Sequence, residues 1–233
     1  MIIKKILTII LSLSVIFPIY SSFAEAPSAE QIKLEKDKIK YKAYIPVKYD
    51  LFEAIEGDLN KDGQKDLVLI VKATDPKAII NHEDRGQLDR NRRGIIVLLN
   101  ENGKYKQILK NLSCFSSENE DGGVYFAPEL WVTVEKNRLH VHYGHGRYGY
   151  WDYNFRLENT DLRLIGYEQS NNHGPYVESE ISVNLLTGKK LLRTNIVKDD
   201  EAEPKFKEQW TNIQIAPIYL SQIKDFDELD FVE

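Results

Sequence analysis

Short runs of alternating apolar and polar residues, each closed by turn residues, follow one another through most of this chain. Residues 130–134 and 139–143 alternate on either side of a polar turn, and residues 181–186 and 190–195 flank a Thr-Gly turn. A period of two is the pattern of a strand that buries one face. About ten such strands, joined mainly by hairpins, predict an all-β fold. We expect either a propeller-like arrangement or a curved antiparallel meander closed on itself.

The first residues have the pattern of an export signal. Two lysines precede an apolar stretch at 6–16, and Ser22 and Ala24 have the small side chains of a cleavage site. We expect a signal peptide at 1–24 and a periplasmic or secreted protein, with an uncleaved anchor as the alternative. No later stretch approaches the ~18 apolar residues of a spanning helix, so no membrane span is expected in the mature protein.

The remaining chain divides into two parts. Residues 25–43 are rich in Lys, Glu and Ala with little apolar periodicity, which is typical of a linker or a short helix. Residues 44–233 carry the alternating runs and are expected to form a single β domain. Within it, the charged stretch 81–93 predicts a long exposed loop, either a solvated insertion or a contact loop. The acidic segment after Asp199 predicts a solvated tail or an edge segment.

Composition disfavours some partners and cross-links. The formal net charge is −5, whereas a nucleic-acid-binding protein needs a basic face, so no nucleic-acid partner is expected. Cys114 is the single cysteine, which excludes a disulfide framework. We expect it to be buried as a small apolar residue.

The sharpest local motif lies at 58–66, between two predicted strands. Oxygen-bearing side chains occupy its positions 1, 3, 5 and 9, and Gly63 permits a sharp turn at position 6. Ca²⁺ takes about six to eight oxygen ligands, so the motif predicts a structural calcium site, with a polar hairpin turn as the alternative. Leu69 stands at position 12, where an EF-hand would have Glu. The expected ligands are the side chains of Asp58, Asn60, Asp62 and Asp66 and the backbone carbonyl of Gln64.

Residues 140–151 are the segment richest in side chains that carry chemistry. His140 and His142 would share one face of a strand, and His145 could turn back through Gly144. Three histidines can hold zinc with a fourth position open. The alternative is a polar strand face without a metal.

The same segment is also typical of a displayed recognition loop. Its glycines allow unusual backbone angles, and Arg147, Tyr148 and Tyr150 are residue types that anchor interfaces. We predict these three as partner-binding residues, with the turn at 171–176 lining the same end. Three aromatic residues of the following strand are expected in the core: Trp151, Tyr153 and Phe155.

Blocks at 57–63, 155–167 and 181–189 resemble a widespread group of small exported Gram-negative proteins. The loop at 58–66 is similar to the calcium loops of FG-GAP and VCBS-type propeller blades. Some similar proteins resemble periplasmic inhibitors of lysozymes and related peptidoglycan hydrolases, in which a protruding loop blocks the enzyme's cleft. The resemblance implies a propeller-like fold with one calcium loop, and it assigns the plug to residues 147–150.

These observations leave three functions open. The first is a calcium-stabilised, non-catalytic periplasmic protein that inhibits a cell-wall hydrolase. The second is a carbohydrate- or cell-surface-binding module, in which Trp131 and Tyr148 stack on the sugars of a glycan. The third is a hydrolase whose metal is held by the three histidines. The sequence shows no readable Ser/His/Asp order, Walker loop or dinucleotide fingerprint, which disfavours an enzyme.

Overall fold

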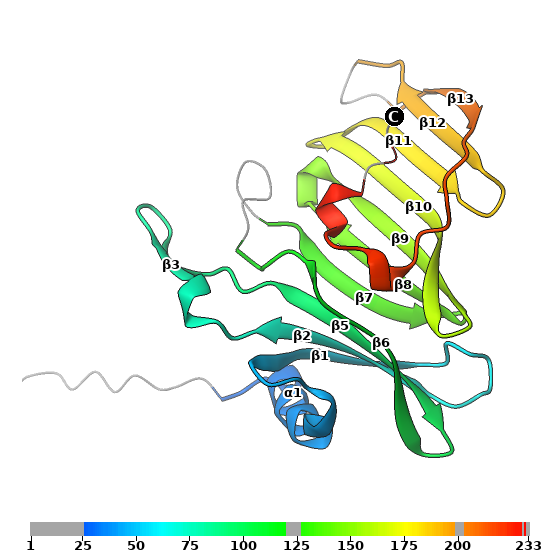
Figure 1. Ribbon diagram of the computed structural model, residues 1–233. Coiled ribbons are helices and arrows are strands. Elements are labelled where there is room, and N and C mark those ends of the chain that lie inside the picture. The colour runs from blue at the N-terminus through cyan, green and yellow to red at the C-terminus, as the bar shows by residue number, and fades with distance from the viewer. Residues whose placement is uncertain (1–25, 120–126, 199–202, 230, 232–233) are drawn as a thin grey trace, which may run out of the picture.

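The computed structural model describes residues 26–119, 127–198, 203–229 and 231 (Figure 1). These residues contain one α-helix, α1 (Ala29–Lys40), and thirteen strands, which pair in antiparallel sheets. The strands are β1 (Tyr49–Gly57), β2 (Asp66–Ala73), β3 (Ile79–His82), β4 (Gly86–Asp89), β5 (Arg93–Glu101), β6 (Lys104–Phe115), β7 (Glu129–Glu135), β8 (Arg138–Gly144), β9 (Gly149–Glu158), β10 (Asp161–His173), β11 (Tyr176–Asn184), β12 (Lys189–Asn195) and β13 (Phe206–Asn212). The all-β prediction is confirmed, whereas the expected signal peptide at 1–24 lies outside the described residues.

Helix α1 falls in the segment predicted as a linker or short helix, and it begins with a capping box. Ser28 Oγ accepts a hydrogen bond from Gln31 N at 3.2 Å, and the Gln31 side chain accepts one from Ser28 N at 2.8 Å. These bonds satisfy backbone donors that a helix start leaves free. No helix among the described residues is long and apolar enough to cross a membrane.

The first sheet has four strands in the order β1-β2-β5-β6, and its central strands are buried on both faces. Val68 and Ile70 of β2 pack into the core between the two large sheets. Leu67 and Leu69 point the other way, into a smaller cluster that contains Tyr41 from the end of α1. Burial on both faces explains why β2 reads as a continuous apolar run rather than an alternating one.

The second sheet has seven strands in the order β13-β12-β11-β10-β9-β8-β7. Each strand pairs with its neighbour in sequence, so the antiparallel meander is present here. The propeller expectation is not confirmed. The described strands form two open sheets and a two-stranded ribbon, because the hairpins extend one sheet instead of starting separate blades (Figure 1).

The C-terminal segment, predicted as a solvated tail or edge segment, behaves in two ways. Strand β13 does form the edge of the large sheet, but the following short helices η4 (Leu220–Gln222) and η5 (Phe226–Glu228) lie against the core (Figure 1). Phe226 has no exposed surface, and its ring centroid is 5.0 Å from that of Phe115 in β6 and 4.9 Å from that of Tyr153 in β9. The expectation of a solvated tail is therefore wrong at Phe226. The acidic residues on either side of it predicted an exposed segment, but its own ring is buried.

The long exposed loop expected at 81–93 is also corrected. Strands β3 and β4 pair as a ribbon that projects from the first sheet, with Gly86 at φ +73° in its turn (Figure 1). Leu88 and Arg93 are buried at 6% and 3% exposed. The sequence did not predict this ribbon, because most of its side chains are partly or fully exposed and charged residues surround its turn.

The residues predicted for the core are found there. Tyr153 and Phe155 are buried, and Trp151 is half-buried with its ring stacked on Tyr143 at 5.7 Å. Cys114 is fully buried, and this burial raises the pKa of its thiol to about 12. Such a thiol stays protonated and behaves as a packing residue.

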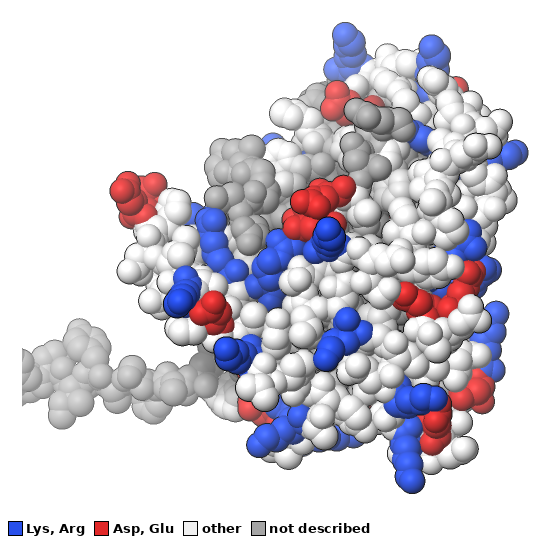
Figure 2. Space-filling view, viewed as in Figure 1, with Lys and Arg blue, Asp and Glu red and all other residues white. Residues whose placement is uncertain are grey.

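Charged side chains are interspersed over the view in Figure 2. Basic and acidic groups are both scattered there, and no continuous basic surface covers that face of the described chain. One ion pair connects the residue before β5 with the C-terminal segment: Arg92 Nη2 lies 2.7 Å from Asp225 Oδ2. The prediction of no nucleic-acid partner stays a prediction.

Candidate functional site

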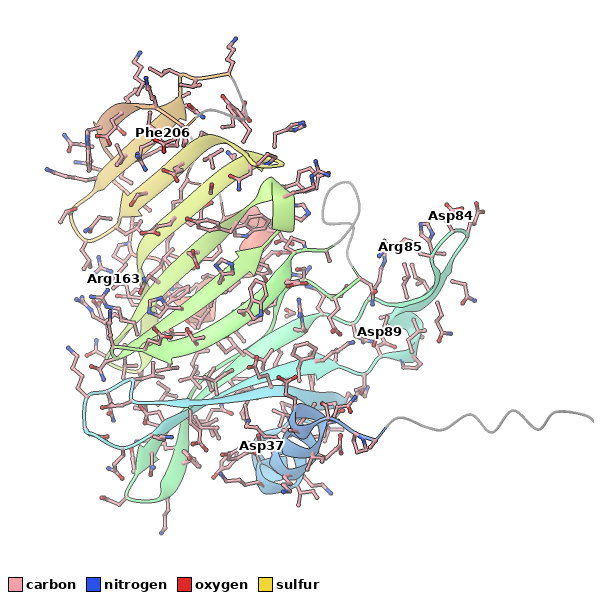
Figure 3. The ribbon with its side chains drawn as sticks, turned by 180° about the vertical axis from the view of Figure 1, so that it is seen from behind. Asp37, Asp84, Arg85, Asp89, Arg163 and Phe206 are labelled. Carbon is pink, nitrogen blue, oxygen red and sulfur yellow. The ribbon has the colours of Figure 1, made fainter. Side chains whose placement is uncertain are left out.

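A pocket of about 590 Å³ lies on the face of the seven-stranded sheet that is turned away from the core. It sits where β7 begins, β8 ends and β9 begins. In Figure 3, which shows the molecule from behind, no described helix crosses this face of the sheet. We call it the aromatic pocket, and it is lined by Ala127, Glu129, Trp131, His142, Gly144, His145, Gly146, Arg147, Tyr148, Gly149 and Tyr150.

Strand register brings the central rings together. Trp131 of β7 is the cross-strand partner of His142 of β8, so their side chains share one face. Their ring centroids are 5.2 Å apart, and the Tyr150 ring stacks on the other side of His142 at 5.5 Å. Trp131 keeps 49% of its surface exposed, which is unusual for a tryptophan and leaves one side of the indole open.

A glycine makes room for the indole. A Cβ at Gly144 would lie 2.5 Å from Trp131 Cζ3, closer than such atoms approach, and 3.3 Å from His142 Nε2. Any larger residue at this position would push the indole from its place. Gly144 is therefore a structural requirement of the pocket.

His142 is held in orientation by an acidic partner. Its Nδ1 lies 2.7 Å from Asp152 Oδ1 of β9, a distance that fits an Nδ1–H hydrogen bond to the carboxylate. Both side chains are about one-third exposed. The pair orients the imidazole between the rings of Trp131 and Tyr150 on the floor of the pocket.

The wall of the pocket is a tight turn between β8 and β9. His145 N donates to Gly149 O at 2.8 Å, and Tyr148 N donates to His145 O at 3.0 Å. Gly149 has φ +111°, and a Cβ there would lie 1.8 Å from Ser170 O, so only glycine fits. The turn is thus closely held against the sheet.

All three predicted partner-binding residues line this pocket. Arg147 is exposed at the tip of the turn, whereas Tyr148 and Tyr150 are half-buried in the wall and floor. The second turn, predicted at 171–176, lies beside them, since Gly174 N donates to Arg147 O at 3.0 Å. The arrangement forms a wall around a concavity.

The three histidines considered for zinc have different surroundings. His142 and His145 both line the aromatic pocket, and the His145 ring packs on Tyr148 at 5.2 Å. His140 lies two residues before His142 on β8, where its cross-strand partners are Thr133 and Asn154, and it is not among the residues that line the pocket. The histidine-metal hydrolase stays a prediction.

The predicted calcium loop folds around its first aspartate. Asp58 Oδ1 accepts a hydrogen bond from Lys61 N at 2.6 Å, and Oδ2 accepts one from Gly63 N at 3.1 Å. Asp62 Oδ1 accepts one from Gln64 N at 2.7 Å. Asn60 Nδ2 lies 3.0 Å from Asp62 Oδ2, so the side chains at positions 3 and 5 are close together. The donor set consists of oxygens, as a hard cation requires.

Asp66, the last predicted ligand, has a different environment. It has no exposed surface, its Oδ2 accepts a hydrogen bond from Leu59 N at 2.7 Å, and its Oδ1 accepts one from Asn100 N at 2.9 Å. Through Oδ2 Asp66 closes the loop onto Leu59, and through Oδ1 it joins the loop to the neighbouring β5–β6 hairpin. Asp66 can serve a cation only by sharing an oxygen that already accepts a backbone N–H.

Sequence reasoning missed two parts of the site. It treated Trp131 only as one surface that could stack on sugars, and it did not pair His142 with Asp152. The signal for both is the register of the β7-β8-β9 hairpins, because it places Trp131, His142 and Asp152 in one row. Comparisons with known protein families, with curated proteins and with solved structures found no match.

Proposed function

We propose that this chain is an exported, non-catalytic carbohydrate-binding protein, stabilised by calcium, and that the aromatic pocket is its binding site. The observation that carries the proposal is the open face of Trp131 beside His142 and Tyr150, in a concave site on the seven-stranded sheet. The proposed ligand class is the glycan of a cell wall or cell surface. The loop at 58–66 would hold Ca²⁺ in a structural role.

The chemistry of the pocket suits a sugar. A pyranose ring has C–H faces that pack on aromatic rings, while its rim carries hydroxyl groups that need hydrogen-bond partners. The pocket supplies rings at Trp131 and Tyr148, with a cation at Arg147 and a carboxylate at Glu129 on its border. Ligand sites of this kind combine apolar lining with a few placed polar groups.

Inhibition of a peptidoglycan hydrolase is the second candidate, and one observation favours it. Arg147 is exposed at the tip of the turn, where a partner protein could contact it. The turn is nevertheless held back against the sheet by the bond from Gly174 N to Arg147 O. An inhibitor of this type needs a loop that protrudes into the enzyme's cleft, whereas this turn forms the wall of a concave pocket, which suits a bound ligand. The carbohydrate site therefore ranks first.

The test is binding of short soluble sugars by isothermal titration calorimetry. The ligands are the disaccharides of N-acetylglucosamine, glucosamine and glucose. At least one should bind the wild-type protein at the aromatic pocket, and Trp131→Ala should weaken it at least about tenfold, which corresponds to about 1.4 kcal/mol. Trp210→Ala is the matched control. Trp210 is also an exposed tryptophan, at 62%, but it lies on β13 at the far edge of the same sheet.

Equal affinities of the wild type and Trp131→Ala for every sugar that binds would overturn the assignment of the pocket. The inhibitor would be favoured instead if no sugar bound, if the immobilised protein recovered a hydrolase, and if Arg147→Ala abolished that recovery. Trp131→Ala and Trp210→Ala should keep the wild-type melting temperature to within a few degrees, because both tryptophan side chains are on the surface.

A further inference from the structure

One row of side chains crosses the entire seven-stranded sheet on the face that carries the aromatic pocket. Each member is the direct cross-strand partner of the next, so all lie on the same face. Their neighbours in sequence, such as Val132, Tyr153 and Val183, are buried on the opposite face. The row, in strand order from β7 to β13, is Trp131, His142, Asp152, Glu168, Ser182, Leu191 and Trp210.

The row has an exposed tryptophan at each end. Trp131 is 49% and Trp210 is 62% exposed. Neighbouring strands lie about 4.8 Å apart, so the six steps between the outer strands span ~29 Å. A single monosaccharide or disaccharide cannot reach from one tryptophan to the other, whereas an extended chain can.

The concave surface continues beyond the aromatic pocket along this row. A second pocket, of about 280 Å³, is lined by Tyr150, Glu168, Gln169, Glu180, Ile181, Ser182, Leu191 and Arg193. Tyr150 lines both pockets, so the two are adjacent. We call the surface over β7 to β12 that carries these two adjacent pockets the sheet groove.

The middle of the sheet groove is acidic. Asp152 is paired with His142, and Glu180 forms an ion pair with Arg193. Glu168, which lies between Asp152 and Ser182 in the row, has no side-chain hydrogen bond or ion pair within the described part of the chain. Burial, and then the charges of Glu168, Asp152 and Glu180, raise the pKa of Tyr150, as expected for a ring beside several carboxylates.

We infer that the sheet groove binds a linear glycan of amino sugars, laid along the row from Trp131 toward Trp210, with a protonated amine at Glu168. This inference rests on the proposed function and adds the form and charge of the ligand. An unpaired carboxylate in a polar groove attracts a cation and repels a polyanion. Aromatic rings at both ends supply stacking surfaces, and the intervening Ser182 and Asp152 supply hydrogen-bond acceptors for sugar hydroxyls.

The experiment compares three soluble ligands by calorimetry: the glucosamine disaccharide, the glucosamine hexasaccharide and the N-acetylglucosamine hexasaccharide. The glucosamine hexasaccharide should bind at least tenfold more tightly than either of the other two, and added salt should weaken it. Trp210→Ala should weaken the glucosamine hexasaccharide at least fivefold and leave disaccharide binding unchanged.

Two charge variants test the position of the amine. Glu168→Gln should make the two hexasaccharides bind equally, since it removes the unpaired carboxylate. Glu83→Gln is the control, because Glu83 is an exposed carboxylate in the turn of the β3–β4 ribbon, next to the labelled Asp84 in Figure 3. It should keep the preference for the amine.

The outcomes separate the inference from the proposed function. Equal binding of both hexasaccharides by the wild type, or no effect of Trp210→Ala and Glu168→Gln, would overturn the inference while disaccharide binding at Trp131 still supported the proposed function. Failure of every sugar to bind would overturn both.

Discussion

At the scale of single residues, two aspartates of the same loop have different tasks. The Asp62 side chain is exposed and its contacts lie within the loop, whereas Asp66 is buried and accepts backbone N–H groups from Leu59 and Asn100. A motif assigns both to calcium, but burial separates them. Asp66 stabilises the fold with or without a cation.

This difference predicts that substitutions of the two aspartates depend differently on calcium. Asp62→Ala should lower the melting temperature in calcium and leave it almost unchanged in chelator, because it removes a ligand. Asp66→Ala should lower it in both conditions, because each buried N–H left without an acceptor costs about 1–3 kcal/mol of folding free energy. Thermal unfolding monitored by circular dichroism measures both. Equal losses for Asp62→Ala in the two conditions would contradict the calcium site.

Gly144 predicts a second effect at this scale. Gly144→Ala should weaken disaccharide binding at least about tenfold, since the added methyl group displaces the Trp131 indole. Gly166→Ala is the matched control. Its new Cβ would meet only Asn154 Cβ at 3.5 Å and Val183 O at 3.8 Å, which are ordinary contacts. Calorimetry with wild-type affinity for Gly144→Ala would show that the indole position does not matter.

At the scale of secondary-structure elements, the sequence predicted the hairpins of the large sheet well. The runs at 130–134 and 139–143 lie within β7 and β8, and the Thr-Gly turn does join β11 to β12. These elements were readable because one face is buried and the other is polar, which produces alternation. The β3–β4 ribbon was missed because nearly all of its side chains are partly or fully exposed, so no alternation of buried apolar and exposed polar residues marks it.

A carboxylate at the β9–β10 hairpin gives an element-scale prediction about pH. Hydrogen bonds from Arg156 and Arg163 lower the pKa of Glu158 below its ordinary value of 4.5. The folded state therefore favours the ionised Glu158 carboxylate. Its contribution to the free energy of unfolding is fully present above pH 4.5 and is lost as the pH falls through the lower pKa of the folded state.

Glu158→Gln should therefore lower the free energy of unfolding at pH 7 by up to about 1 kcal/mol. The difference from the wild type should shrink as the pH falls below 4.5, because the wild type loses the same interaction. Urea unfolding across this pH range measures it. Glu101→Gln, in the β5–β6 hairpin, is the control for an exposed ion pair. A deficit of Glu158→Gln that persisted unchanged at pH 3 would contradict this account.

At the scale of the whole molecule, the two large sheets share one core, and the C-terminal segment helps to close it. Phe226 contacts rings from both sheets, at Phe115 and Tyr153. Sequence alone did not reveal this packing, because it depends on contacts between residues far apart in the chain. The same reason explains the candidate site: its aromatic residues were visible, but the pairing of His142 with Asp152 required the strand register.

Phe226→Ala should cost about 3–5 kcal/mol of folding free energy, because it leaves a cavity between the sheets. Phe206→Ala, on the edge strand β13, should cost less than half as much, since that ring is only partly buried. Denaturant unfolding measures both variants. A loss below about 1 kcal/mol for Phe226→Ala would mean that the C-terminal segment is not part of the core.

The central claim is that the aromatic pocket binds carbohydrate, and the indole N–H signals of the three tryptophans test it most directly. Trp131 borders the pocket, Trp151 packs against the core, and Trp210 lies at the far edge of the sheet. In a ¹H–¹⁵N NMR titration with a disaccharide that binds, the Trp131 signal, assigned with Trp131→Phe, should move in a saturable manner while the Trp210 signal stays in place. A saturable shift confined to Trp151 or Trp210, or no shift of Trp131 at saturation, would contradict the claim.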